Sequence, residues 1–287
     1  MPGFFFWGLR QSPFAPRRTM PLLDPLLIVE LALIGTGTGF LAGLLGIGGA
    51  MVMVPSLTMI LTHRGFPPDY TVKMAVATSL ATIAFTSLSS MRSHHQRGAV
   101  LWPVVKVLAP GILVGSAIGA QLAHALPGRL LAIVFAVFVS FSATQMLLNR
   151  KPKPSRTLPG PLATFGVGNL IGLLSALVGA GGAFVSVPFM TWCNVKIHDA
   201  VGTSSALGFP IAVAGTLGYI YAGMGLPQMP PGSVGYLYLP GLIIISLASM
   251  LMAPVGARTA HRMDIQPLQK LFALVLYCLA AYFLLRD

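Results

Sequence analysis

Charge is the scarcest property of this chain. Only 8% of its 287 residues are charged and just 6 are Asp or Glu, whereas 55% are hydrophobic. Soluble domains carry about 25% charged residues, so a soluble globular enzyme and a disordered chain are both excluded. Together with a mean hydropathy of +0.81, this composition leaves one broad class, a protein that crosses the membrane several times.

Cysteine is also scarce. Cys193 and Cys278 form no CxxC pair, which excludes a secreted disulfide scaffold and gives a metal or redox site no support. His94 and His95 lie in a basic loop without a Cys or carboxylate cluster, so we expect no metal site there. The sequence shows no arrangement of nucleophile, base and orienting acid. We therefore expect neither an enzyme nor a cofactor.

Long apolar runs are what the chain does contain. About 20 residues cross a hydrocarbon core of roughly 30 Å. Two shorter runs, 50–62 and 183–192, each follow a glycine cluster and cannot cross alone without a strong tilt. The long runs are too continuously apolar for barrel strands, so the predicted fold is an all-α polytopic bundle with 8–10 membrane segments, some of them broken or re-entrant. The predicted spans lie near residues 25–45, 72–91, 100–122, 130–148, 161–178, 200–221, 235–257 and 268–285.

The chain repeats itself. LLGIGGAMVMVP at 44–55 returns as LVGAGGAFVSVP at 177–188, and AVATS at 75–79 returns as AVGTS at 200–204. In the same order, GAVLWP at 98–103 matches GYLYLP at 235–240. These matches predict four parts: an N-terminal tail at 1–19, a first transmembrane repeat at 20–149, a basic linker at 150–156 and a second transmembrane repeat at 157–287.

Basic residues orient the chain. The 18 Lys and Arg residues give a formal net charge of +12, which in a membrane protein marks cytoplasmic loops rather than a nucleic-acid partner. Arg92, Arg97 and the linker share one side under any topology, and that side should be cytoplasmic. Re-entrant short runs give eight crossings with the N-terminus inside. Crossing short runs give ten, with inverted halves and the N-terminus outside. The charge rule does not choose, but a start at Met20 instead of Met1 favours the inverted topology.

The glycine clusters GIGG at 46–49 and GAGG at 179–182 are the strongest functional signal. Glycine weakens a helix by about 1 kcal/mol relative to alanine. The short helix after each break begins with free N–H groups and a partial positive charge, which suit an anion. Close packing or a kink is the alternative. We expect a substrate site at these backbone positions: Gly46, Gly48, Gly49, Ala50, Gly179, Gly181, Gly182 and Ala183.

Side chains that would assist this site follow at matched positions. Hydroxyls can donate to an anion, or they can bond back to carbonyls of their own helix. Lys73 and His198, five residues before the matched threonines, are candidates to attract the anion, with snorkelling to the interface as the alternative. The candidate hydroxyls are Thr78, Ser79, Thr203, Ser204 and Ser205.

Two further patterns matter. Glu30 is the acidic residue that lies clearly inside a predicted span, where carboxylates often carry protons or sodium. It is a candidate coupling residue, and interface placement is the alternative. Small residues four apart let membrane helices touch, so we read three such stripes as packing surfaces. They are Gly35, Gly39 and Gly43; Gly111, Gly115 and Gly119; and Gly168, Gly172 and Ala176.

The G-[IA]-G-G-A-x-x-x-V-P signature in both halves, and the A-x-T-S sequence after it, resemble the sulfite exporter TauE/SafE family, also called the toluene sulfonate uptake permease family. The resemblance covers about residues 25–286. It implies a multi-pass transporter in the bacterial inner membrane for sulfur-containing anions such as sulfite, thiosulfate or organosulfonates. Ala50 and Ala183 depart from the family, because many members have a third glycine there.

We therefore predict a secondary transporter that exports a small sulfur-containing anion. An inside-negative potential supplies about 2.3 kcal/mol per charge per 100 mV toward anion exit, so export needs no proton-carrying carboxylate. One alternative is proton- or sodium-coupled import of thiosulfate, sulfoacetate or another organic anion. The other is a non-transporting accessory or sensor subunit. The expected partners are the anion and the lipid bilayer, with a homo-oligomer left open.

Overall fold

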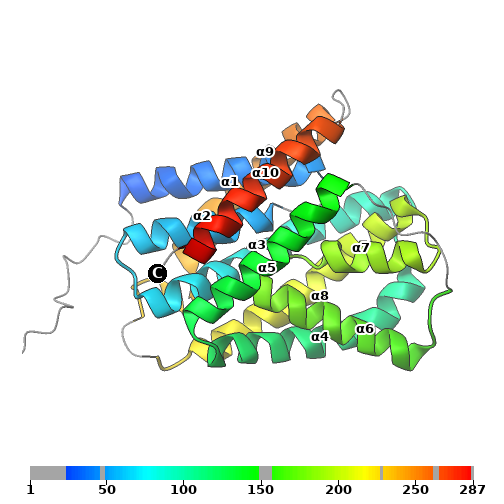
Figure 1. The fold of residues 1–287 in the computed structure, drawn as a ribbon, viewed down its shortest axis with the longest axis horizontal. Helices are drawn as coiled ribbons and strands as arrows, with labels where there is room; N and C mark the ends of the chain where they lie inside the picture. Colours follow the sequence, from blue (N-terminus) through cyan, green and yellow to red (C-terminus); the bar gives the residue numbers. More distant parts are fainter. Residues whose placement is uncertain (1–23, 46–48, 149–156, 227–228, 261–264, 286–287) are drawn as a thin grey trace, which may run out of the picture.

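The computed structural model describes residues 24–45, 49–148, 157–226, 229–260 and 265–285 (Figure 1). The described chain is almost wholly helical, as predicted, with one pair of two-residue strands. Its elements, in order, are α1 (Pro25–Leu45), α2 (Ala50–His63), α3 (Pro68–Gln96), α4 (Trp102–Ala125), α5 (Gly128–Leu148), α6 (Pro161–Val178), α7 (Ala183–Trp192), α8 (Ile197–Gly223), β1 (Ser233–Val234), β2 (Leu237–Tyr238), α9 (Leu239–Ala260) and α10 (Ile265–Leu285).

The helices confirm a multi-pass membrane protein. Among the described residues, 7 helices are long and apolar enough to cross a membrane. The two short runs form α2 and α7, with 14 and 10 residues, and the predicted span 268–285 falls in α10. The span predicted near 235–257 begins later, at Leu239, because residues 233–238 form an antiparallel hairpin instead.

Glycine stripes hold four of the helices together in parallel pairs. A Cβ on Gly115 of α4 would overlap the Asn169 carbonyl of α6, and a Cβ on Gly172 of α6 would overlap the Ile112 carbonyl of α4. Likewise, Gly39 of α1 lies against the backbone of Ser249 of α9. Backbones come this close only where the side chain is absent, so the predicted packing role of these glycines is confirmed.

Helices α3 and α8 run antiparallel through the middle of the molecule. Ser90 Oγ lies 3.2 Å from Ser205 Oγ, so the late part of α3 meets the early part of α8. At the other end, Leu80 of α3 lies against Gly215 of α8. These two helices carry the matched AVATS and AVGTS segments, so the matched segments run in opposite directions.

The molecule has two ends. We call one the hairpin end, because the β1–β2 hairpin meets the start of α3 and the end of α8 there, through Tyr70 and Tyr219. We call the other the linker end, because α6 begins there after residues 150–156, beside the start of α4 (Figure 1). Arg92 and Arg97, which are exposed, lie at the linker end.

The topology follows from where the chain returns. Arg64, just after α2, pairs with Asp24, just before α1, so α2 brings the chain back to the end where α1 begins. In Figure 1, α1 begins at the left of the molecule and α6 at the right. This arrangement supports the inverted, ten-crossing alternative. The division into repeats at 20–149 and 157–287 remains a prediction, and the tail 1–19 and the linker 150–156 lie outside the described residues.

Candidate functional site

The second glycine break separates α6 from α7. Gly179 ends α6 with φ +72° and Gly182 precedes α7 with φ +76°, a left-handed conformation that side chains other than glycine rarely adopt. The amides of Gly179 and Ala180 both donate to the Ser175 carbonyl, which closes α6. Among the described residues, no group accepts from the amides of residues 181–184. Helix α7 therefore begins with unpaired donors.

Apolar side chains cover this break closely. A Cβ on Gly182 would overlap Cδ1 of Ile211, and a Cβ on Gly179 would lie 2.9 Å from Cγ2 of Val54. Ile83 Cγ2 would lie 3.5 Å from a Cβ on Gly181. Close packing, the alternative considered from the sequence, thus holds at the same glycines that turn the backbone. Neither explanation excludes the other.

Only part of the first break can be placed. Gly46 and Gly48 lie outside the described residues. Gly49 precedes α2 without a side-chain cap, and a Cβ there would overlap the Thr38 carbonyl of α1. Ala50, which is buried, begins α2, and Val54 one turn later touches Gly179. The start of α2 therefore lies next to the second break, although the two breaks are 133 residues apart.

Buried hydroxyls from both halves surround the second break. Ser79 of α3 donates to the Gly179 carbonyl at 3.0 Å. Ser204 of α8 lies 2.7 Å from Ser186 of α7, oxygen to oxygen. These side chains are at most 2% exposed. Ser79 and Ser204 thus reach out to the broken helix rather than back to their own carbonyls, and Ala183, which is half-buried, begins α7.

Each of the two matched threonines makes the same contact with the other half of the chain, Thr78 with the second half and Thr203 with the first. Thr78 Oγ1 accepts from the amide of Tyr238 at 3.2 Å, and Thr203 Oγ1 accepts from the amide of Leu101 at 3.0 Å. Tyr238 and Leu101 occupy corresponding positions in GYLYLP and GAVLWP. Each threonine acts as an acceptor here, so its own O–H hydrogen is left for a further partner. These reciprocal contacts support the proposed repeat.

Ser205 behaves differently from the other hydroxyls. Its Oγ donates to the Val201 carbonyl one turn earlier on α8, at 3.0 Å, and accepts from Ser90. For Ser205 the structure therefore shows the alternative reading, a hydroxyl that bonds to its own helix.

Lys73 and His198 match in sequence but differ in environment. Lys73 is 6% exposed and donates to the His124 carbonyl at 2.8 Å, at the hairpin end. His198 is exposed at the linker end. The two residues were predicted to have equivalent roles, but Lys73 is buried and His198 is exposed. Tyr236 of the hairpin covers Lys73, and no matching segment of the described chain covers His198.

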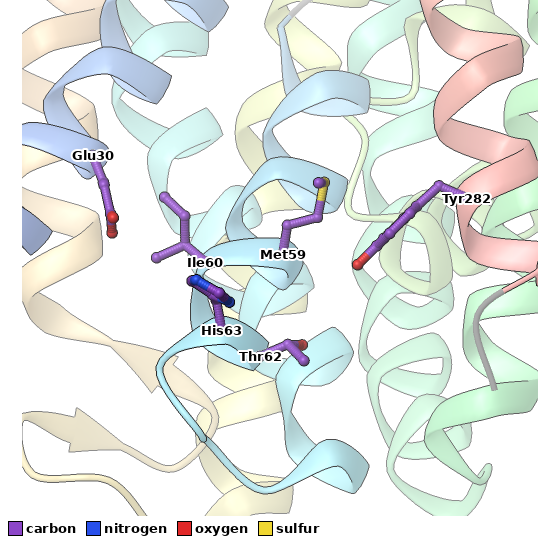
Figure 2. Close-up of a pocket in the computed structure, with 6 residues that line it drawn as sticks. All are labelled: Glu30, Met59, Ile60, Thr62, His63 and Tyr282. Carbon is purple, nitrogen blue, oxygen red and sulfur yellow. The ribbon is translucent and has the colours of Figure 1, made fainter.

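Glu30 pairs with a cation. Arg64 donates to Glu30 Oε2 from Nη2 at 2.9 Å and from Nε at 3.3 Å, and also binds Asp24. Glu30 also borders an open hollow of about 510 Å³ between α1, α2 and α10, which His63 and Tyr282 help to line (Figure 2). Glu30 thus has a structural role as the ion-pair partner of Arg64, and its role in coupling stays a prediction.

The ion pair between Arg64 and Asp24 predicts how the stability of the protein depends on pH. The hydrogen bond from Arg64 lowers the pKa of Asp24 below its ordinary value of 3.8. A lowered folded pKa adds stability above the ordinary value, and that stability is lost as the pH falls through the folded value. We expect the melting temperature of Asp24→Asn to lie slightly below that of the wild type at pH 7, with the gap closing below pH 3.8. A gap that persists at lower pH would contradict this.

Several residues of the site were not predicted. Ser175 and Ser186 flank the second break, and Tyr236 and Tyr238 bring the hairpin onto α3. Ser186 has Met53 as its counterpart, so the repeat gave no signal for it. Among the described residues, no group of three or more His, Cys, Asp or Glu is placed to hold a metal ion.

Known proteins resemble this chain over most of its length. A "Probable membrane transporter protein" of Haemophilus influenzae is 35% identical over 254 residues, which are 88% of this chain and 96% of the relative. "Probable membrane transporter protein YdhB" of Bacillus subtilis is 29% identical, over 78% of this chain and 87% of the relative. "Probable membrane transporter protein MJ0441" of Methanocaldococcus jannaschii is 28% identical, over 82% and 83%. No solved structure matches the chain.

The family comparison agrees with the architecture. Residues 31–283 match the family described as "Sulfite exporter TauE/SafE", so the match takes in both glycine breaks, the hydroxyl-bearing helices and the hairpin. The chain is a multi-pass membrane transporter protein that belongs to the TauE/SafE family.

Proposed function

We propose that this protein is a secondary transporter that exports a small sulfur-containing anion, such as sulfite or an organosulfonate, across the inner membrane. The observation that carries the proposal is the start of α7. Its amides at residues 181–184 are unpaired within the described chain and lie beside buried hydroxyls of α3 and α8. Unpaired donors within a membrane are costly, and an anion satisfies them.

The charges around this site favour an anion. No carboxylate lies among the residues described above as surrounding the second break, so nothing there repels a negative ligand. The hydroxyls and amides offer donors without a fixed charge, so the anion is held without a salt bridge and can leave again. With 6 acidic residues in the whole chain, a cation path has little to line it.

Direction follows from the membrane potential. An inside-negative potential drives an anion outward, and this needs no coupling ion. The alternative, coupled import, would call on Glu30, which Arg64 already neutralises. We therefore favour export, with the linker end, which carries Arg92 and Arg97, facing the cytoplasm.

Two serines at the break test this function. In proteoliposomes loaded with sulfite, thiosulfate or sulfoacetate, we expect the wild type to release at least one of these anions when the potential is inside-negative. Ser79→Ala and Ser204→Ala should each slow release by about tenfold, because each loses a buried hydrogen bond, worth about 1–1.5 kcal/mol, that holds the broken helix in place around the anion. Release should not depend on an imposed proton gradient.

Ser205→Ala is the matched control. It removes a hydroxyl from the same helix as Ser204, but one that bonds to its own backbone. Its release rate should stay within about twofold of the wild type. If the wild type releases none of the three anions, or if all three serine variants behave alike, the proposed function is wrong.

A further inference from the structure

Lys73 is a buried cation with little to balance it. Its ammonium group has three donors, and among the described residues only the His124 carbonyl accepts from it. No carboxylate of the described chain lies within ion-pair distance of it, and Asp69, one turn earlier on α3, is exposed. A buried charge without a partner is costly, so a ligand that could pair with Lys73 would gain from doing so.

Tyr236 covers Lys73 at the hairpin end. The ammonium lies 5.7 Å from the centre of the Tyr236 ring, and the phenol oxygen lies 3.0 Å from Nδ1 of His124. Tyr70 and Tyr219 pack edge-on against the same ring, with centroids 6.0 and 6.2 Å away. Tyr236 is 1% exposed, so its ring fills the space above Lys73.

Tyr236 belongs to a small structural element, the β1–β2 hairpin. The strands on either side of Tyr236 have two residues each, and they pair only with each other. The Tyr236 amide reaches the Tyr219 carbonyl at 3.5 Å, the long limit of a hydrogen bond. Among the described residues, the hairpin is bonded to the helices by this contact, by the Tyr236 hydroxyl to His124 and by the Tyr238 amide to Thr78, and it can move without unfolding a helix once these bonds break.

The opposite end lacks both features. The counterpart of Tyr236 in the sequence match is Ala99, and the counterpart of Lys73 is His198, which is exposed. Packing alone does not call for a lysine under a tyrosine, since an apolar side chain would fill the same space without a buried charge. The presence of a buried lysine and its tyrosine cover at one end alone of the described chain therefore indicates a function for them at the hairpin end.

We propose that Lys73 is the cation that selects the substrate anion at the hairpin end, and that Tyr236 is the cover that must move for the anion to pass. The inference rests on the proposed function. Lys73 precedes Thr78 by five residues, or about 7.5 Å along α3, so it lies on the way from the glycine break to the hairpin end. When the hairpin lifts, an oxyanion replaces the His124 carbonyl as its partner.

Neutral variants of Lys73 test this inference. In the proteoliposome assay, Lys73→Met and Lys73→Gln should raise the KM for the transported anion by about tenfold while the maximal rate changes much less, because a cation that attracts the anion along its path acts mainly on binding. Lys106→Met is the control, since Lys106 is an exposed lysine of α4, and its KM should not change.

The outcomes separate this inference from the proposed function. If the wild type transports none of the anions, the proposed function fails. If the wild type transports and either folded neutral variant keeps the wild-type KM, the role of Lys73 is overturned. If neither neutral variant folds, the charge is structural and the inference is also overturned. Tyr236→Leu loses the bond to His124 but keeps an apolar cover. This variant should speed the passage of the anion at the hairpin end and leave unchanged the KM for anion that enters at the linker end.

Discussion

Gly182→Val is expected to abolish anion release while leaving the protein folded in the membrane. Valine at this position meets two obstacles: the backbone has φ +76°, and a Cβ would overlap Cδ1 of Ile211. The left-handed conformation costs a β-branched residue roughly 1–2 kcal/mol, and the overlap costs about 1–3 kcal/mol more. The chain can relieve both only by re-forming the turn before α7, which moves the unpaired amides.

A matched glycine in the same helix pair controls for the added side chain. Gly166 lies on α6, and nothing lies within 4 Å of a Cβ placed there. We expect Gly166→Val to release the anion at close to the wild-type rate and Gly182→Val to fall at least about a hundredfold, the change that corresponds to about 2.7 kcal/mol. Equal rates for the two variants would show that the turn at Gly182 does not shape the anion site.

Gly115→Val is expected to have the largest effect on stability. Gly115 lets α4 approach α6 so closely that a Cβ would overlap the Asn169 carbonyl. A valine must push the two backbones apart along the whole stripe, because Gly111 and Gly119 make similar contacts with α6. We expect a loss of about 3 kcal/mol or more in the free energy of unfolding, beyond what a single poorly packed side chain costs.

The buried thiol of Cys193 gives a measurement of this loss. In a Cys278→Ser background, which removes the exposed thiol, a thiol-reactive dye reports unfolding as Cys193 becomes accessible. The transition temperature of Gly115→Val should fall well below that of Gly37→Val, whose added side chain meets nothing within 4 Å. Equal transition temperatures would mean that the α4–α6 contact is not closely packed.

Local composition was enough to predict most of the fold. Long apolar runs have only one way to satisfy their backbone in lipid, so the helices at 161–178 and 130–148 could be placed to within two residues of α6 and α5. The glycine stripes also carried their meaning in the sequence, since spacing by four puts them on one helix face. The two short helices were predicted for a similar reason, because glycine clusters end a helix wherever they stand.

Partners and burial were beyond the sequence. Residues 235–238 of the hairpin match residues 98–101, which form no strand, so the repeat did not predict the hairpin. Tyr236 of that hairpin lies over Lys73, which is buried, whereas His198 is exposed, so equivalent positions in the repeat did not reveal unequal environments. The partners of Ser79 and Thr78 lie 100 and 160 residues away, and only the folded chain brings them together.

The most direct test of the central claim is the voltage dependence of anion movement through the second glycine break. Proteoliposomes holding the wild type or Gly182→Val are given a potential of about 100 mV, inside-negative, and release of radiolabelled thiosulfate or sulfite is followed. The wild type is predicted to drive the anion outward to a concentration ratio of about fiftyfold for each negative charge it carries, the equivalent of 2.3 kcal/mol per charge, and Gly182→Val to match empty liposomes. Release by the wild type that ignores the potential, or that Gly182→Val retains in full, would contradict the account.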